Sequence, residues 1–319
     1  MIISASYKTD IPAFYGDWFM NRLKAGYCRM VNPYGRQVLT VPLDHDAVDG
    51  FVFWTRNLGP FLGHLGEVGR LGYPFVVHET VTGYPRALDY ATIDAARAAG
   101  HLRATARAFG ARVPVWRYDP IVFTSLTPPE WHRATFARLA ASLAGHVDEV
   151  VVSFAHVYRK TERNMAAAAR AFRFDWRDPD ADEKRALLAD LAARADDAGM
   201  ALTLCGQPEL LVDGVAEARC IDAGRLGDVA GAAIAGVHKP HRERCACWAS
   251  RDIGEYDTCP HGCVYCYAVR NRTLAKRRHR GHDPESEFLW GGGAEAGAGT
   301  PAHPARANQE IPAGKSRVI

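Results

Sequence analysis

Residues 50–79, GFVFWTRNLGPFLGHLGEVGRLGYPFVVHE, contain the unit from which the fold of this chain is predicted. The runs 50–55 and 74–79 are short and almost entirely apolar, which is typical of strands that are buried on both faces. Between them, residues 61–70 have the spacing of a short helix, although three glycines weaken it. A strand, a helix and a second strand in this order predict a parallel pair joined by a crossover helix.

The same unit repeats on both sides of this stretch. Four further strands are predicted, at 1–6, 113–117, 149–154 and 200–205, and helical patterns occur at 12–23, 90–109, 128–143 and 182–198. Six strands that alternate with helices predict an α/β protein with a parallel sheet. An open doubly wound sheet is one arrangement of such units. We expect a partial or full (β/α) TIM-like barrel instead, because polar residues follow nearly every strand, where barrels carry their sites.

Five of these polar residues are candidates for a functional site. Asp10, Glu79, Arg117 and Asp119 could contact substrate or cofactor, and Arg117 could form a forked pair with a carboxylate or phosphate. Asn57 could hold ribose hydroxyls or simply end its strand. Residues in such places are also common as caps, and Asp119 before Pro120 could equally cap a turn.

The alternation of strands and helices fades after residue 215. We therefore expect a barrel core at 1–215, a cysteine-rich segment at 216–290 that packs on the barrel mouth, and a disordered tail at 291–319, rich in Gly, Ala and Pro. The basic run KRRHR at 276–280 could contact phosphates. Cations at the end of a helix also complement its dipole, which is the simpler interpretation.

Composition limits the class of protein. The 319 residues are 48% hydrophobic and 24% charged, as in ordinary globular proteins. The net charge of +3 is too small to indicate nucleic-acid binding by itself. No apolar run approaches the roughly 18 residues that cross a bilayer, and the first ten residues do not resemble a secretory signal. We expect a cytoplasmic protein with no membrane partner.

The cysteines give the strongest chemical signal. Cys259, Cys263 and Cys266 have the spacing C-x3-C-x2-C, and Gly262 permits a tight backbone wrap around a common centre. Three thiolates are one fewer than a closed tetrahedral zinc site needs. On a cubane iron–sulfur cluster, three thiolates leave one iron open for a small ligand. A structural zinc site with Cys245 or Cys247 as fourth ligand is the alternative.

The segment CPHGCVYCYA (259–268) resembles the cluster-binding motif of the radical S-adenosylmethionine (radical SAM) superfamily, in particular its spore-photoproduct-lyase-like branch. The resemblance implies that the three cysteines hold a [4Fe–4S] cluster and that its open iron binds S-adenosyl-L-methionine. It implies reductive cleavage to a 5′-deoxyadenosyl radical, a partial (β/α)6 barrel, and Tyr265 packed near the adenine. A reductant such as a flavodoxin or ferredoxin would supply the electron.

The position of the motif departs from that superfamily. There the motif follows the first strand of the core, whereas here it follows the sixth predicted strand. Either the barrel is circularly permuted, or the C-terminal segment folds back over the barrel mouth. No convincing Gly-Gly-Glu segment follows a strand.

A second resemblance covers most of the chain. The segments SASYKTDIPAFYGDWFMNR (4–22), VFWTRN (52–57), RYDPI (117–121) and CACWASRDIGEYDTCPHGCVYCYA (245–268) together resemble the bacterial family called domain of unknown function 1848. That family has a C-terminal cysteine cluster similar to the radical SAM one. Tyr7 and Lys8 stand where the family has two arginines, so a forked arginine contact is lost there.

Four other late cysteines, Cys205, Cys220, Cys245 and Cys247, would suffice for a second, closed [4Fe–4S] cluster. Cys205 and Cys220 could instead be small buried hydrophobes. The sequence therefore predicts a radical SAM-like iron–sulfur enzyme that acts on a small-molecule or nucleic-acid-derived substrate. The alternative is a non-enzymatic zinc or iron–sulfur module that binds nucleic acid or a partner, or transfers electrons.

Overall fold

The computed structural model describes residues 1–32, 37–240 and 244–291. At its centre lies a parallel sheet of eight strands in the order β11-β10-β8-β6-β5-β4-β1-β12. Their bounds are β1 Ile2–Ala5, β4 Gly50–Thr55, β5 Phe75–Thr80, β6 Pro114–Ile121, β8 Glu149–Phe154, β10 Ala201–Leu204, β11 Ala216–Glu217 and β12 Ser250–Asp252. All six predicted strands are present in this sheet.

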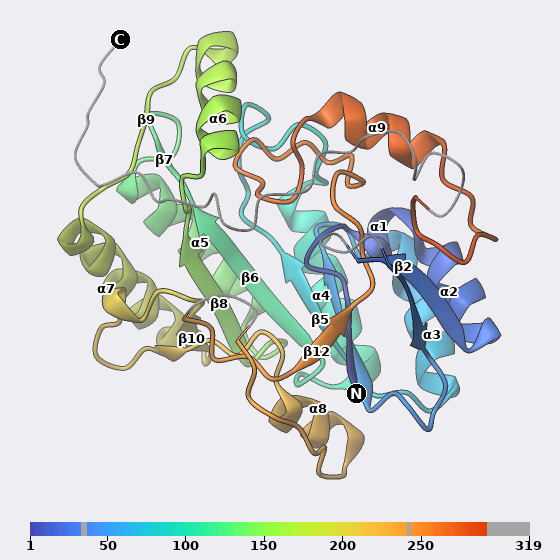
Figure 1. Ribbon diagram of the computed structural model, residues 1–319. Helices are drawn as coiled ribbons and strands as arrows, with labels where there is room; N and C mark the ends of the chain where they lie inside the picture. The colour runs from blue at the N-terminus through green and yellow to red at the C-terminus, as the bar shows by residue number, and fades with distance from the viewer. Residues whose placement is uncertain (33–36, 241–243, 292–319) are drawn as a thin grey trace.

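The described helices lie in the connections between strands, except for α9, which follows β12. Two short antiparallel pairs lie outside the sheet. The helices are α1 Ile11–Phe14, α2 Gly16–Ala25, α3 Leu62–Arg70, α4 Ala95–Phe109, α5 Pro129–Leu143, α6 Arg159–Phe172, α7 Ala181–Asp197, α8 Ala223–Ala230 and α9 Arg272–Arg280. The short pairs are β2 (Tyr27–Val31) with β3 (Val38–Pro42), and β7 (Phe123–Thr124) with β9 (Trp176–Arg177). In Figure 1, α6 and α9 lie above the carboxyl ends of the strands and α8 lies below the sheet.

One face of the sheet packs against the helices of the connections. Near β1 and β4, Phe51 and Phe53 are fully buried and contact Phe19 of α2 edge to face. Near β6 and β8, Trp116 contacts Phe136 of α5 with ring centroids 4.8 Å apart. Successive side chains of a strand point to opposite faces of the sheet. The residues before and after these aromatic residues in each strand therefore point to the opposite face.

The opposite face is covered by the segment that follows β11. Ile2, Val52, Val76, Val115 and Val151, one from each of five strands, form a core with residues 218–226 and Cys247. Helix α8 is fixed at the amino ends of the strands by Arg225, which donates to Asp148 and Glu149 at 2.8 Å each. Both bonds come from Arg225 Nη2, and Nη1 donates to Arg112 O at 2.7 Å, so the buried guanidinium is held by three charge-assisted hydrogen bonds.

The mixed α/β class and the parallel sheet are confirmed, but a closed barrel is not. From β1 to β11 the strands lie in chain order without the reversal of a doubly wound sheet. β11 and β12 end the sheet, and no pairing joins them within the described residues. The sequence missed these two strands because they span two and three residues, too few for a periodic pattern to show.

Strand β12 adds the C-terminal cysteine segment to the edge of the sheet. It pairs with β1 in parallel, with Ile2 opposite Ser250 and Ser4 opposite Asp252. Residues 216–290 thus contribute two strands to the same sheet, while a boundary at residue 215 stays a prediction. The predicted tail, 291–319, lies outside the described residues apart from Gly291. No described helix combines the length and apolar character needed to cross a membrane.

Candidate functional site

The cysteine motif lies at the carboxyl ends of β1, β4 and β5. Val264 donates its backbone N–H to Leu88 O in the loop that follows β5, at 3.0 Å. Just before the motif, Thr258 O accepts a hydrogen bond from Tyr15 Oη between α1 and α2, at 2.7 Å. The loop therefore closes over three strand ends that are widely separated from it in the sequence (Figure 1).

The three thiols of the motif lie close enough to affect one another. Burial is the main cause that raises the pKa of Cys259, Cys263 and Cys266 above the usual range of a thiol. The charge of Cys266 raises the pKa of Cys259 and Cys263 further. A cation bound among these three partly buried thiols would lower their pKa values again, because a positive charge favours the thiolate form.

Backbone amides point at two of these sulfurs. Cys259 accepts hydrogen bonds from the N–H groups of His261 and Asp10. Cys266 accepts from Ala268 at 3.3 Å and also from Val269. Hydrogen bonds to thiolate sulfur stabilise its negative charge and are one of the means by which proteins tune iron–sulfur clusters.

Arg56, Asp89 and Tyr265 form a buried network beside Cys263. Arg56, directly after β4, pairs with Asp89, and the two side chains are 13% and 2% exposed. Tyr265 Oη accepts from Arg56 Nη2 at 2.6 Å and donates to Asp89 Oδ1 at 2.7 Å. The guanidinium lies over the Tyr265 ring, 5.5 Å from its centroid. The aromatic residue between the last two cysteines is thereby fixed in position.

Asp10 connects the motif to two of the strand ends. Its carboxylate caps α1 through Ala13 N at 2.9 Å and accepts from Arg56 N at 2.8 Å. It also contacts His261 Nε2 at 2.8 Å. The structure thus brings the predicted site residues Asp10 and Tyr265 together with the three motif cysteines.

Sequence reasoning did not assign roles to Asp89 and His261. His261 lies inside the cysteine motif, and this position is a signal that could have singled it out. Asp89 has no comparable local signal, because only the folded loop after β5 brings it to Arg56 and Tyr265.

The other late cysteines form a second group, on the sheet face that α8 and the cysteine-rich segment cover. Cys220 Sγ lies 3.4 Å from Cys205 Sγ. Cys220 also shares a hydrogen bond with Cys247, and Cys247 shares one with Cys245. The structure therefore brings all four cysteines of the predicted second cluster together.

Arg117 and Asp119 belong to this second group and not to the motif. Arg117 forms a forked pair with Asp119, with its Nε and Nη2 atoms 2.9 and 2.6 Å from the two carboxylate oxygens. Its Nη1 donates to Cys220 Sγ at 3.1 Å, and its guanidinium lies 5.0 Å from the ring centroid of Trp54. The two predicted site residues thus bind each other beside a thiol.

Glu79 and Asn57 occupy places that suit structural roles. Glu79 lies fully buried and accepts from Leu58 N at 3.1 Å, with His101 Nδ1 at 3.2 Å. The pKa of Glu79 is raised, because burial outweighs the opposing effect of the hydrogen bond with His101. Asn57 Oδ1 accepts from Gly59 N at 3.3 Å, which makes it a cap after β4. Functional roles for both residues stay predictions.

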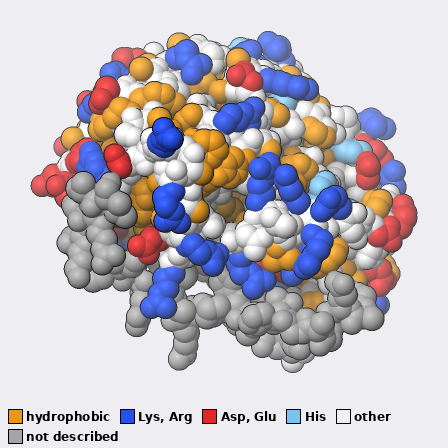
Figure 2. Space-filling model, turned by 90° about the horizontal axis from the view of Figure 1, so that it is seen from above, with side chains coloured by type: hydrophobic (Ala, Val, Ile, Leu, Met, Phe, Trp, Pro, Cys, Tyr) orange, Lys and Arg blue, Asp and Glu red, His pale blue; other side chains and the backbone are white. Residues whose placement is uncertain are grey.

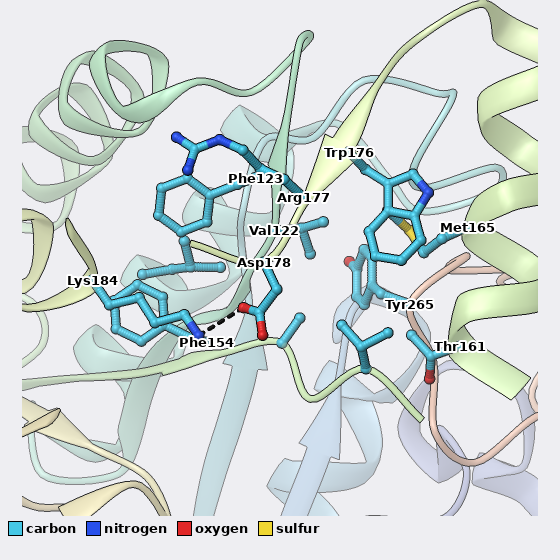
Figure 3. Close-up of a pocket in the computed structure, with 13 residues that line it drawn as sticks. Val122, Phe123, Phe154, Thr161, Met165, Trp176, Arg177, Asp178, Lys184 and Tyr265 are labelled. Atoms are coloured by element: carbon cyan, nitrogen blue, oxygen red, sulfur yellow. Dashed lines mark ion pairs between the residues drawn. The ribbon is translucent and has the colours of Figure 1, made fainter. Parts of the chain in front are cut away.

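A pocket opens next to Tyr265. Figure 3 shows Val122, Met165, Trp176 and Tyr265 around it. Lys184 and Asp178 form an ion pair of 2.6 Å on its wall. Figure 2 looks onto the face of the molecule over the carboxyl ends of the strands. Hydrophobic side chains gather around a hollow near its centre, and Lys and Arg side chains surround them.

The described residues contain no group of three or more His, Cys, Asp or Glu side chains arranged for a single metal ion. A cubane cluster does not require such convergence, because each thiolate binds its own iron. The motif fits a cluster by its donor chemistry: three neighbouring thiols, with backbone amides directed at two of the sulfurs.

The fold and the site define an α/β protein with two groups of cysteines. One group lies at the carboxyl ends of the parallel strands, and the other lies on the sheet face that α8 covers. The chain belongs to the family described as Domain of unknown function (DUF1848), whose pattern matches residues 2–268. No curated protein and no solved structure matches the chain significantly.

Proposed function

We propose that this protein is a radical SAM-like iron–sulfur enzyme. Cys259, Cys263 and Cys266 would hold a [4Fe–4S] cluster, and S-adenosyl-L-methionine would bind beside it. When bound and reduced by a flavodoxin or ferredoxin, the cluster would supply the electron that cleaves this cofactor to methionine and a 5′-deoxyadenosyl radical. The substrate would be a small or nucleic-acid-derived molecule.

The observation that carries this proposal is the place of β12 in the sheet. β12 lies at the edge beside β1 and parallel to it, and the motif follows β12 after a few residues. In spatial order the motif therefore follows the first strand, although it comes late in the chain. This is the strand position that the radical SAM resemblance requires, and it supports a circularly permuted arrangement of that fold.

The surroundings of the motif suit binding of a charged nucleotide. Arg56 and Asp89 fix the Tyr265 ring, which would pack against an adenine. Asp10 fixes His261 and thereby the backbone between the first two cysteines. The adjoining pocket is lined mostly by apolar side chains and shares Tyr265 with the motif.

The test is an anaerobic assay. The full chain is reconstituted with iron and sulfide and reduced with dithionite. S-adenosyl-L-methionine is added, and 5′-deoxyadenosine is quantified. We expect the product from the unaltered protein and its loss in Cys263→Ala, because that variant removes one of three cluster ligands.

Cys28→Ala is the matched control, since Cys28 is fully buried in the core behind α2 and lies outside both cysteine groups. It should keep the activity. Equal production by Cys263→Ala and the unaltered chain, or no product from an iron-loaded unaltered chain, would contradict the proposal.

A further inference from the structure

Two helices over the carboxyl ends of the strands hold an excess of positive charge. α6 has four basic residues and one acidic residue, and α9 has five basic residues and no acidic one. Their formal charges of +3 and +5 give +8 together, whereas the whole chain carries only +3. On this face, Lys and Arg side chains spread across the centre, and Asp and Glu lie mainly at the margins (Figure 2).

Helix stability does not account for these charges. Cations complement the last turn of a helix, but Arg159 begins α6 and Arg272 begins α9, where the helix dipole opposes them. Lys276 and Arg280 are four residues apart, so their like charges repel each other on one side of α9. A bound polyanion would relieve both effects.

Most of these cations reach solvent, and one of them connects the two helices. Arg163 of α6 donates through Nη2 to Arg270 O, two residues before α9, at 3.0 Å. Arg278 instead holds α9 in place, because it donates to Tyr256 O at 2.8 Å. Six basic side chains of the two helices are exposed: Arg159, Arg163, Arg170, Lys276, Arg277 and Arg280.

An aromatic platform, formed by Tyr90, Phe172 and Arg272, lies between these helices and the cysteine motif. Phe172 ends α6 and is 45% exposed, and its ring centroid lies 5.7 Å from that of Tyr90. The Arg272 guanidinium lies 5.1 Å from the Tyr90 centroid. Both residues pack on the motif: a Cβ added to Gly262 would come 3.1 Å from Tyr90 Cδ2 and 2.5 Å from Arg272 Cδ. An accessible ring among cations suits the stacking of an unpaired base.

We infer that this face binds a single-stranded nucleic acid. Its phosphates contact the exposed cations of α6 and α9, and a base stacks on Phe172 of the platform. A duplex fits less well, because its bases already stack on one another. A membrane surface also fits less well, since α9 offers only Leu274 and the buried Ala275 as apolar side chains. The inference goes beyond the proposed function and uses no motif cysteine.

Binding is measured by fluorescence anisotropy, with the full chain and a labelled oligo-dT of about 16 nucleotides. We expect the affinity to fall steeply with salt, because each phosphate contact releases counterions. Arg277→Gln combined with Arg280→Gln should weaken binding roughly tenfold and reduce the slope of log affinity against log salt by about 1.4, the share of two contacts with a single strand. Oligo-U of the same length compares RNA with DNA, and binding of either strand supports the inference.

Arg70→Gln combined with Arg107→Gln is the matched control. Both residues are exposed and lie in the last turns of α3 and α4, where the chain returns to the amino ends of β5 and β6. This variant loses the same two charges from the same kind of helix position, so its affinity should change little. Equal losses in the two double variants would overturn the inference, because only the net charge would then matter.

Phe172→Ala tests the stacking of a base. It should lower the affinity about tenfold and leave the salt slope unchanged. Leu71→Ala, at a position that is 42% exposed, should keep the affinity. The inference would be overturned if Phe172→Ala bound normally or a duplex bound as tightly as the single strand. Binding to vesicles of anionic lipid but not to either oligonucleotide would also overturn it. The metal-free chain suffices, so failure of the proposed enzyme activity leaves these results unchanged.

Discussion

At the scale of single residues, Arg56 is the side chain on which the motif environment depends most. It lies between a carboxylate and a phenol, and both of its partners are buried. A buried ion pair contributes modest net stability when intact. Removal of one partner is costly because the remaining charge is left without compensation.

We therefore predict that Arg56→Gln lowers the free energy of unfolding by about 3–5 kcal/mol, because Asp89 is left buried and unpaired. Lys24→Gln is the comparison, since Lys24 and Glu67 form a pair with side chains 60% and 31% exposed. That change should cost less than about 1 kcal/mol. Urea unfolding measures both, and similar losses for the two variants would refute the role given to Arg56.

At the scale of elements, the junction between β12 and the motif depends on close packing against the end of β1. Asp252 accepts hydrogen bonds from Ser4 Oγ at 2.8 Å and Ser6 Oγ at 2.9 Å. Gly254 lies against Ser6, and a Cβ added to Gly254 would come 2.6 Å from Ser6 Cβ. Glycine is needed here because the two segments approach too closely for any side chain.

Gly254→Ala should therefore destabilise the protein by about 1–3 kcal/mol, since Ser6 must move and its bond to Asp252 weakens. Gly66→Ala is the matched change in the middle of α3, where an added Cβ meets no atom within 4 Å. It should stabilise the helix by about 0.5–1 kcal/mol. Thermal unfolding of the two variants should shift in opposite directions, and a shared direction would count against this account of the junction.

At the scale of the whole molecule, the two faces of the sheet depend on different parts of the chain. The core shared by β6, β8, α4, α5 and α7 contains no cysteine. The opposite face is closed by the segments that carry the second cysteine group. The motif, where metal binding is proposed, packs in a separate group of buried residues with Tyr84, Leu88 and Val122. Metal binding should therefore stabilise the motif loop far more than the core of β6 and β8.

Amide hydrogen exchange tests this division. In the reconstituted protein, residues 257–268 should exchange roughly tenfold or more slowly than in the metal-free protein, because metal binding opposes local opening. Amides of β6 and β8 should change little. If amide exchange slowed equally in residues 257–268 and in β6 and β8, the motif loop and the core of β6 and β8 would not open independently.

The sequence by itself determined the α/β class, because buried parallel strands are recognisable as short apolar runs such as 50–55 and 149–154, both of which match strands of the structure. Its prediction of one helix at 12–23 was wrong in detail: α1 ends at Phe14 and α2 begins at Gly16. The motif spacing identified three of the residues of the candidate site.

Only the tertiary structure decided how the distant residues are combined. It placed β12 beside β1, divided the predicted site residues between the motif and the second cysteine group, and set Glu79 against His101. Local patterns report which face of a strand or helix is buried. They carry no information on which strand ends meet, because that depends on pairing and packing between segments far apart in the chain.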